Sequence, residues 1–235
     1  MVSCSTDYTE DIENSEPLLG MGYGISSSTF FVNNLKSARD YYADTLGFDM
    51  PNSSKFKKSQ IDGAITTRLR FPDMATIEFL SIEDSLISNK VPTYISDFLA
   101  NYEGIQKYSL SSSSVDTTYS WLTNKGFKMD SVKSYRTSDN AVKGWSRDTG
   151  ESQERSLNFV DDSKYLPNFK ENIDSDYKQM QKMWKSYYAF GRSFSKHKNG
   201  AVGIVAIQIA VDSLASAREK FQKMGFSELG DIESK

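Results

Sequence analysis

The chain has 235 residues and a mass of 26.5 kDa, which is long enough for one large domain or two small ones. Hydrophobic residues make up 38% and charged residues 25%, as in soluble globular proteins, and no apolar run approaches the length of a membrane-spanning helix. The net charge of −3 argues against a nucleic-acid-binding protein, because such domains usually carry a basic face. One cysteine and one histidine exclude an intrachain disulfide and a zinc site built from several such side chains.

Residues 1–23 are predicted to form a disordered N-terminal arm, because most of the segment is polar, acidic and aperiodic. Cys4 has two interpretations. It is an ordinary cysteine of this arm, or it is the lipidated residue of a bacterial lipoprotein, since Val2-Ser3-Cys4 resembles the end of a lipobox. The second interpretation requires a signal sequence upstream of Met1. The sequence therefore leaves two compartments open, the cytoplasm and a membrane surface to which Cys4 tethers the protein.

Three segments repeat one pattern, which consists of a short strand-like run, a turn that can cap a helix, and an amphipathic helix ending in Gly-Phe. These segments are residues 30–50, 110–129 and 209–229. Their glycines, Gly47, Gly126 and Gly225, stand where a helix would end in the left-handed conformation, which glycine adopts without steric cost. We interpret the Gly-Phe pairs as structural features.

Further strands and helices are predicted between and after these segments. Residues 66–71 and 75–81 alternate around Pro72-Asp73-Met74 and predict a hairpin, which a linking helix over 93–102 follows. Strands are predicted over 132–136, 142–145 and 155–160, and a long amphipathic helix over about 169–190. The predicted fold is α+β, with a first βαβββ module and its linking helix over 24–103. A second module with the long helix covers 104–195, and a third, apparently truncated after its strand and helix, covers 196–235.

The βαβββ repeat, with a helix ending in Leu46-Gly47-Phe48, resembles the vicinal oxygen chelate superfamily, the group of glyoxalases, bleomycin-resistance proteins and extradiol dioxygenases. The stretch HKNGAVGIVAIQIAVDSL at 197–214 is similar to the last module of its glyoxalase-like domain subgroup. Arg136, Gly144 and Trp145 resemble a pattern in the middle module of that subgroup. The resemblance covers roughly residues 24–235. It implies that two modules pair, so that the concave faces of their curled mixed sheets form an open barrel around a ligand or a metal.

The resemblance also implies where a metal would bind. The strand position that holds His, Glu or Gln in metal-using relatives is occupied here by Ser27, Lys107 and Ala206, none of which suits a divalent ion. The other family ligand is a glutamate in the last strand of a module, which Glu78 matches and Asn158 replaces. One carboxylate without a histidine makes a weak site, so we predict neither a divalent metal nor any other cofactor.

Strand alternation predicts which side chains face the concave side. Glu78 is the only candidate for a catalytic residue. Because it lies opposite Arg68 in the predicted hairpin, Glu78 either forms an ordinary cross-strand ion pair or contacts a ligand. Arg136 and Trp145 either clamp a planar or acidic ligand or form a pair on the sheet surface. The predicted ligand-binding residues are Thr29, Phe31, Arg68, Glu78, Ser109, Arg136, Trp145 and Gln208.

Two functions from different classes follow. The first is a metal-free small-molecule-binding module, as in the drug-sequestering bleomycin-resistance proteins, because the concave side is lined by small polar residues. The alternative is a metal-assisted lyase, isomerase or dioxygenase, in which Glu78 takes part. A surface protein tethered through Cys4 is compatible with either function. The expected partners are a small molecule and a second copy bound through the module edges, and no nucleic acid.

His197 is the one residue that could serve in a Ser-His-Asp arrangement. It precedes Asn199-Gly200, which is a turn signal. We therefore interpret His197 as a loop residue with structural hydrogen bonds rather than as a general base.

Overall fold

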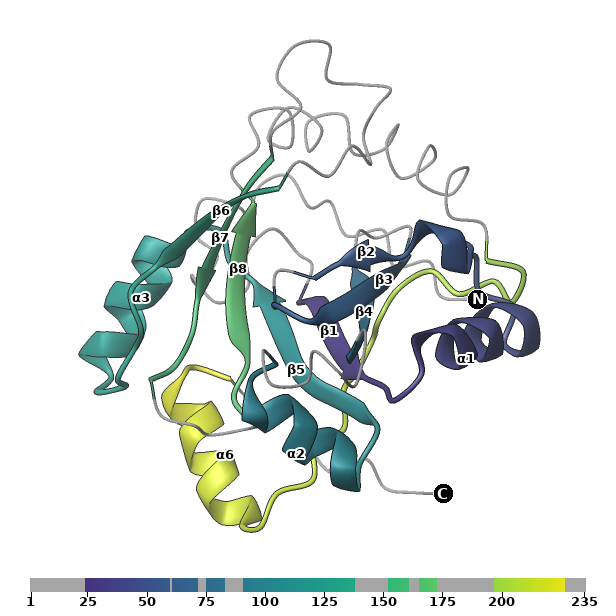
Figure 1. Ribbon diagram of the computed structural model, residues 1–235. Helices are drawn as coiled ribbons and strands as arrows, with labels where there is room; N and C mark the ends of the chain where they lie inside the picture. Colours follow the sequence, from purple (N-terminus) through teal and green to yellow (C-terminus); the bar gives the residue numbers. More distant parts are fainter. Residues whose placement is uncertain are drawn as a thin grey trace, which may run out of the picture.

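The computed structural model describes residues 24–59, 61–71, 75–82, 91–137, 152–160, 165–172 and 197–226. Within these ranges one βαβββ module follows another, as the sequence repeat predicted (Figure 1). The first module consists of β1 (Ile25–Phe31), α1 (Leu35–Asp40), β2 (Lys57–Lys58), β3 (Ala64–Arg70) and β4 (Thr76–Ile82). The second consists of β5 (Gly104–Ser111), α3 (Val115–Asn124), β6 (Lys133–Thr137), β7 (Ser152–Leu157) and β8 (Asn168–Asn172). The linking helix α2 (Thr93–Asn101) joins them. Cys4 and the predicted arm lie outside the described residues.

All eight strands in the described part of the chain belong to one sheet, in the order β2-β3-β4-β1-β5-β8-β7-β6. Within each module the first and last strands pair in parallel, β1 with β4 and β5 with β8. The two modules join where β1 and β5 run antiparallel. The sheet does not close on itself and ends in β2 and β6. A homodimer through the module edges would use these two strands and stays a prediction.

Capping side chains mark the first turns of three helices, and glycines with positive φ values follow their ends. Side chains cap the first turns of α1, α3 and α6 (Leu214–Lys223), the helix of the third repeat. The capping contacts are Asn34 to the amide of Ser37, Ser114 to that of Thr117, and Ser213 to that of Ser216. Helix α1 continues into a wider turn over Tyr41–Thr45. The glycines that follow the three helices have φ values of +76°, +81° and +101°, at Gly47, Gly126 and Gly225.

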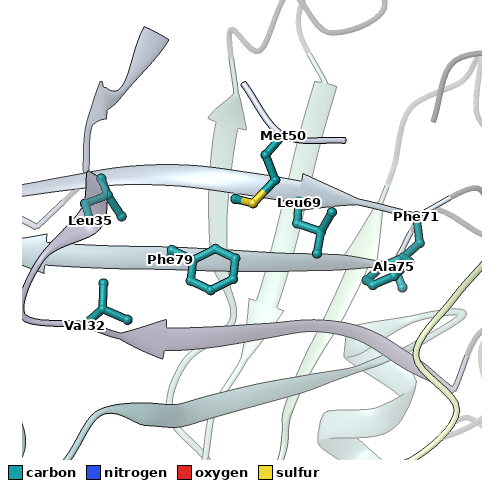
Figure 2. Packing of buried hydrophobic residues seen from close by; sticks show 7 residues of the cluster. All are labelled: Val32, Leu35, Met50, Leu69, Phe71, Ala75 and Phe79. Atoms are coloured by element: carbon teal, nitrogen blue, oxygen red, sulfur yellow. The ribbon is translucent and has the colours of Figure 1, made fainter. Parts of the chain in front are cut away.

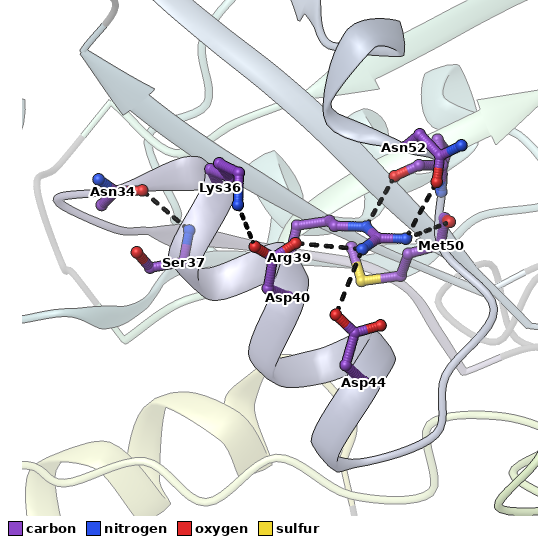
Figure 3. A network of polar contacts seen from close by, with 9 residues as sticks. Asn34, Lys36, Ser37, Arg39, Asp40, Asp44, Met50 and Asn52 are labelled. Atoms are coloured by element: carbon purple, nitrogen blue, oxygen red, sulfur yellow. Dashed lines mark hydrogen bonds and ion pairs between the residues drawn. The ribbon is translucent and has the colours of Figure 1, made fainter.

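Arg39 of α1 fixes the chain that follows the helix (Figure 3). Its Nε donates to the carbonyl of Pro51 at 3.1 Å, and its Nη2 donates to the side-chain oxygen of Asn52 at 3.3 Å. Asp40 and Asp44 lie on the opposite side of the guanidinium group. The arginine therefore ties the helix to the loop between α1 and the short helix η3 (Ser53–Lys55).

Two apolar clusters cover one side of the sheet. In the first module α1 packs on the residues shown in Figure 2, which include the fully buried Leu69 and Phe79. In the second module α3 and α6 cover Leu157 and Phe169, which are also fully buried. Met224 follows the last residue of α6 directly and belongs to this cluster, and its carbonyl accepts a hydrogen bond from Trp121 Nε1 of α3 at 3.2 Å. We call this side of the sheet the outer face.

The third repeat forms its helix but not its predicted strand. Residues 198–213 contain no strand, and Val205 is 97% exposed. A strand exists only where a neighbour supplies hydrogen bonds, and among the described residues no strand pairs with this segment. Figure 1 shows the segment as a yellow-green trace leading from the side of α1 to α6. The predicted strand at Gln208 is therefore wrong for the described structure.

The start of the predicted long helix is also wrong. Asn168–Asn172 form β8, in which Phe169 is fully buried between its register partners Leu110 and Leu157. A short stretch with one apolar residue carries no clear periodicity, so neither structure stands out in the sequence. The rest of that helix, together with the predicted strand 142–145, lies outside the described residues. None of the helices in the described part of the chain has the length and apolar composition needed to span a membrane.

Candidate functional site

Four residues from four neighbouring strands form a row across the centre of the sheet. The backbone register places Arg68 of β3 opposite Glu78 of β4, Glu78 opposite Thr29 of β1, and Thr29 opposite Lys107 of β5. Because side chains alternate along a strand, this row lies on the side opposite Leu69 and Phe79, away from α1 and α3. We call this side the inner face.

A second row of hydroxyl-bearing residues lies beside the first. Ser27 of β1 faces Thr76 of β4 on one side and Ser109 of β5 on the other. Ser27 is 9% exposed and Ser109 is 4% exposed. Among the described residues, none is a hydrogen-bond partner of the hydroxyl groups of Ser27, Thr29 or Ser109. These groups can therefore donate to or accept from a molecule that reaches the inner face.

Glu78 forms the cross-strand ion pair that the sequence predicted. Its Oε1 accepts a hydrogen bond from Arg68 Nε at 3.1 Å and another from Thr66 Oγ1 at 3.0 Å. The Arg68 side chain is 41% exposed and that of Glu78 is 25% exposed, so water screens the pair. Such a pair contributes about 0.2–1 kcal/mol to stability. The contacts hold the carboxylate in place on the inner face, which suits either a structural role or contact with a ligand.

Helix α2 covers one end of the inner face. Phe31 is 2% exposed, and its ring lies 5.6 Å from that of Phe98 and 6.3 Å from that of Tyr94. Phe31 thus belongs to the core beneath α2 rather than to the open part of the inner face. Tyr94, 43% exposed, lies at the border, with the Lys107 ammonium group 5.6 Å from its ring centroid. The helix therefore supplies an aromatic edge beside the polar rows.

The structure brings together only part of the predicted ligand-binding set. Thr29, Arg68, Glu78 and Ser109 share the central inner face. Gln208 is exposed in the segment that forms no strand, so it is not part of the sheet. Arg136 lies on β6 opposite Gln153, at the far end of the sheet order from β3 and β4, and Trp145 lies outside the described residues.

Lys107 and Tyr94 are missing from the predicted ligand-binding set although they border the hydroxyl rows. Strand alternation predicts that Lys107 faces the concave side together with Ser109; its ammonium group makes it unsuitable as a metal ligand but not as a contact for other ligands. No pattern in the sequence indicated Tyr94, because its position depends on how α2 packs against Phe31.

His197 has the structural role predicted for it. It is 6% exposed on the outer side, where its ring meets the edges of Phe48 and Phe71 at centroid distances of 5.3 and 5.4 Å. Its Nδ1 accepts a hydrogen bond from the backbone amide of Asp49 at 2.9 Å. Burial lowers the pKa of His197 below its ordinary value, although the backbone of Arg70 and the charge of Asp49 act in the opposite direction. His197 thus anchors the C-terminal segment to the first module.

The described side chains of the central row do not make a suitable set of ligands for a divalent metal. Glu78 supplies a single carboxylate, already bonded to Arg68, and Lys107 adds a further positive charge to the same row. In the ranges that the structure describes, no three His, Cys, Asp or Glu side chains come together. Divalent ions favour several carboxylate or imidazole donors, which this row lacks.

Comparison with known proteins gives one family and several similar folds. A methylmalonyl-CoA epimerase from Mycobacterium tuberculosis shares 20% identity, with a TM-score of 0.44 over 63% of this chain and 87% of its own. A Streptomyces coelicolor methylmalonyl-CoA epimerase variant in complex with 2-nitronate-propionyl-CoA shares 16%, with a TM-score of 0.43 over 63% and 96%. A hypothetical protein from Staphylococcus aureus shares 13%, with a TM-score of 0.46 over 68% and 63%.

No curated protein sequence matches the chain significantly. The model of the glyoxalase-like domain matches residues 29–225, which begin within β1 and include the rest of both βαβββ modules and helix α6. The chain therefore belongs to the glyoxalase-like domain family.

Proposed function

We propose that the inner face binds a small molecule without the help of a metal ion. The observation that carries this proposal is the group of hydroxyls from Ser27, Thr29 and Ser109, which are gathered at the junction of the two modules. Such groups lose hydrogen bonds to water when a sheet forms around them, and a ligand with polar atoms can restore those bonds. A sheet held rigid by eight strands keeps the hydroxyls in fixed positions.

The alternative is a metal-assisted lyase, isomerase or dioxygenase, and Glu78 is the residue that favours it. Its neighbours argue for the metal-free function, because Arg68 and Thr66 both direct hydrogen atoms at its Oε1. A metal ion in the same place would have to displace or repel the guanidinium group. Binding without a metal is therefore compatible with the observed contacts of Glu78, whereas binding of a metal at Glu78 requires Arg68 to move away.

Thermal-shift screening against a library of small acids, amides and aromatic compounds, followed by calorimetry, tests the proposal. The diagnostic variant is Thr29→Val, which removes a hydroxyl from the inner face at nearly constant shape. The control is Thr45→Val, at an exposed position beyond α1. We expect at least one ligand whose affinity falls about tenfold in Thr29→Val and is unchanged in Thr45→Val.

Two results would overturn the proposal. One is a complete lack of stabilisation by any compound in the library. The other is a stoichiometric divalent metal in protein purified without chelators, with ligand binding lost when that metal is removed. The second result would support the metal-assisted alternative instead.

A further inference from the structure

We propose that the ligand of the inner face is an anion, and that its carboxylate or phosphate group binds between the Lys107 ammonium and the hydroxyls of Thr29 and Ser109. This inference rests on the proposed binding function and adds the chemical class of the ligand. The arguments are the charge of the inner face, the partners of Lys107, and the position of Glu78.

All charged side chains of the four central strands lie on the inner face. Strands β3, β4, β1 and β5 contain four charged residues, and alternation puts every one of them on this side of the sheet. Three are basic, Arg68, Arg70 and Lys107, and one is acidic, Glu78. The side chains of these four strands therefore carry a formal charge of +2, whereas the whole chain carries a net charge of −3. A basic surface on an acidic protein attracts anions selectively.

Lys107 keeps its positive charge available for a ligand. Its ammonium group lies 5.6 Å from the centroid of the Tyr94 ring, and no carboxylate of a described residue pairs with it. A ring holds an ammonium group through its quadrupole and does not neutralise it. Tyr94 therefore orients the lysine side chain over the sheet while the charge stays available to a bound group.

The hydroxyls beside Lys107 complete an anion-binding arrangement. Thr29 is the direct register partner of Lys107, and Ser109 follows two residues later on the same strand and face. Ser109 is 4% exposed, so a hydrogen bond between its hydroxyl and a ligand is largely shielded from water. Hydrogen bonds from a cation and from hydroxyls to an ionised acceptor are short and about twice as strong as neutral ones.

Glu78 lies beside the proposed site and two strands from Lys107. It is the direct register partner of Thr29, about 5 Å away between the backbones of β1 and β4. Its charge is balanced by Arg68, whose Nε lies 3.1 Å from the Glu78 Oε1. This ion pair reduces the repulsion between the Glu78 carboxylate and an anion at Thr29, and Lys107 on the other side of Thr29 attracts that anion.

Titration of the full chain with three probes, followed by calorimetry and by amide NMR shifts, tests this inference. The probes are benzoate, its neutral analogue benzamide, and inorganic phosphate, so that a carboxylate preference is told apart from a phosphate preference. The diagnostic variant is Lys107→Met. The matched control is Lys125→Met, because Lys125 also lies over an aromatic ring, that of Trp121 at 4.8 Å, but at the end of α3.

We expect benzoate or phosphate to bind, with an affinity that falls about tenfold in Lys107→Met and stays unchanged in Lys125→Met. Binding should also weaken as salt concentration rises. Equal affinity for benzamide and benzoate, or an unchanged affinity in Lys107→Met, would overturn the anion inference and leave the binding function standing. No binding of benzoate or phosphate at millimolar concentrations would also overturn it, while the library screen decides the binding function separately.

Discussion

The backbone amide of Asp49 donates a hydrogen bond to Nδ1 of His197 across 2.9 Å, and so joins two residues 148 positions apart. The contact requires a histidine nitrogen without a proton, since a protonated imidazole donates from both nitrogens. The surrounding rings of Phe48 and Phe71 favour the same neutral form. The attachment of the C-terminal segment to the first module therefore depends on the charge of one side chain.

We predict that the protein loses stability when the pH falls from about 7.5 to about 5.5. Burial lowers the pKa of His197 in the folded state below the ordinary value near 6.5, so between these two pKa values the unfolded chain binds more protons. In this pH window the free energy of unfolding therefore increases with pH. Acidification through the pKa that His197 has in the unfolded chain lowers it. Urea denaturation at the two pH values measures the change.

The control for this experiment is His197→Gln, whose side-chain oxygen can still accept from the Asp49 amide and does not titrate. The variant should show a smaller loss of stability over the same pH range. Because the chain contains a single histidine, its imidazole NMR signals report the pKa directly. A measured pKa at or above 6.5 would contradict the prediction.

We predict that Met224→Ala destabilises the protein by about 2–5 kcal/mol, as large-to-small changes do in a packed core. Met224 is fully buried among residues of the second module, although it belongs to the third repeat. The control is Val205→Ala, in the same C-terminal segment 197–226 but 97% exposed, which should change stability by less than about 0.5 kcal/mol. Denaturant unfolding compares the two, and equal effects would show that α6 does not contribute to the core.

We predict that Gly47→Ala and Gly126→Ala destabilise the protein to a similar extent. Both glycines have positive φ values, which cost another residue roughly 1–2 kcal/mol. The added methyl group would meet the backbone nitrogen of Asn199 at 3.4 Å in the first variant and the flexible end of Lys223 at 3.5 Å in the second, and both are ordinary van der Waals contacts. Thermal unfolding of the two variants gives the comparison, and a loss of stability in only one of them would refute the prediction.

We predict a coupling energy of about 0.2–1 kcal/mol between Arg68 and Glu78 in a double-mutant cycle. The variants are Arg68→Met, Glu78→Gln and the double substitution, each measured by urea denaturation. Both side chains are partly exposed, so water screens their attraction. A coupling above about 2 kcal/mol would mean that the pair is a main support of the sheet.

The duplicated module could be predicted from the sequence because local signals agree there. The turn signal Pro72-Asp73-Met74 in the sequence predicts the hairpin register, and the structure places Arg68 opposite Glu78 as this prediction requires. Gly47, Gly126 and Gly225 marked the helix ends correctly because only glycine adopts their backbone conformation easily. These features depend on neighbours in the sequence.

The features that could not be predicted depend on distant parts of the chain. An alternating apolar segment around Gln208 has the composition of a strand, but it forms none because no neighbouring strand pairs with it in the described structure. The sequence predicts a helix at Phe169, whereas the structure places this residue in β8 between Leu110 and Leu157, a position that only pairing across the sheet defines. Of the candidate site, the strand residues of the first module were predictable, whereas the place of Tyr94 follows from the packing of α2.

Residues 197–226 touch the outer faces of both modules, through Ala201 and Ile204 against the first and Phe221 and Met224 against the second. In the sheet itself the modules share only the β1–β5 ladder. The C-terminal segment therefore connects the two modules on the outer face, in addition to the pairing of β1 with β5 within the sheet. Because both sets of contacts join the modules, we expect the two modules to unfold together as one cooperative unit.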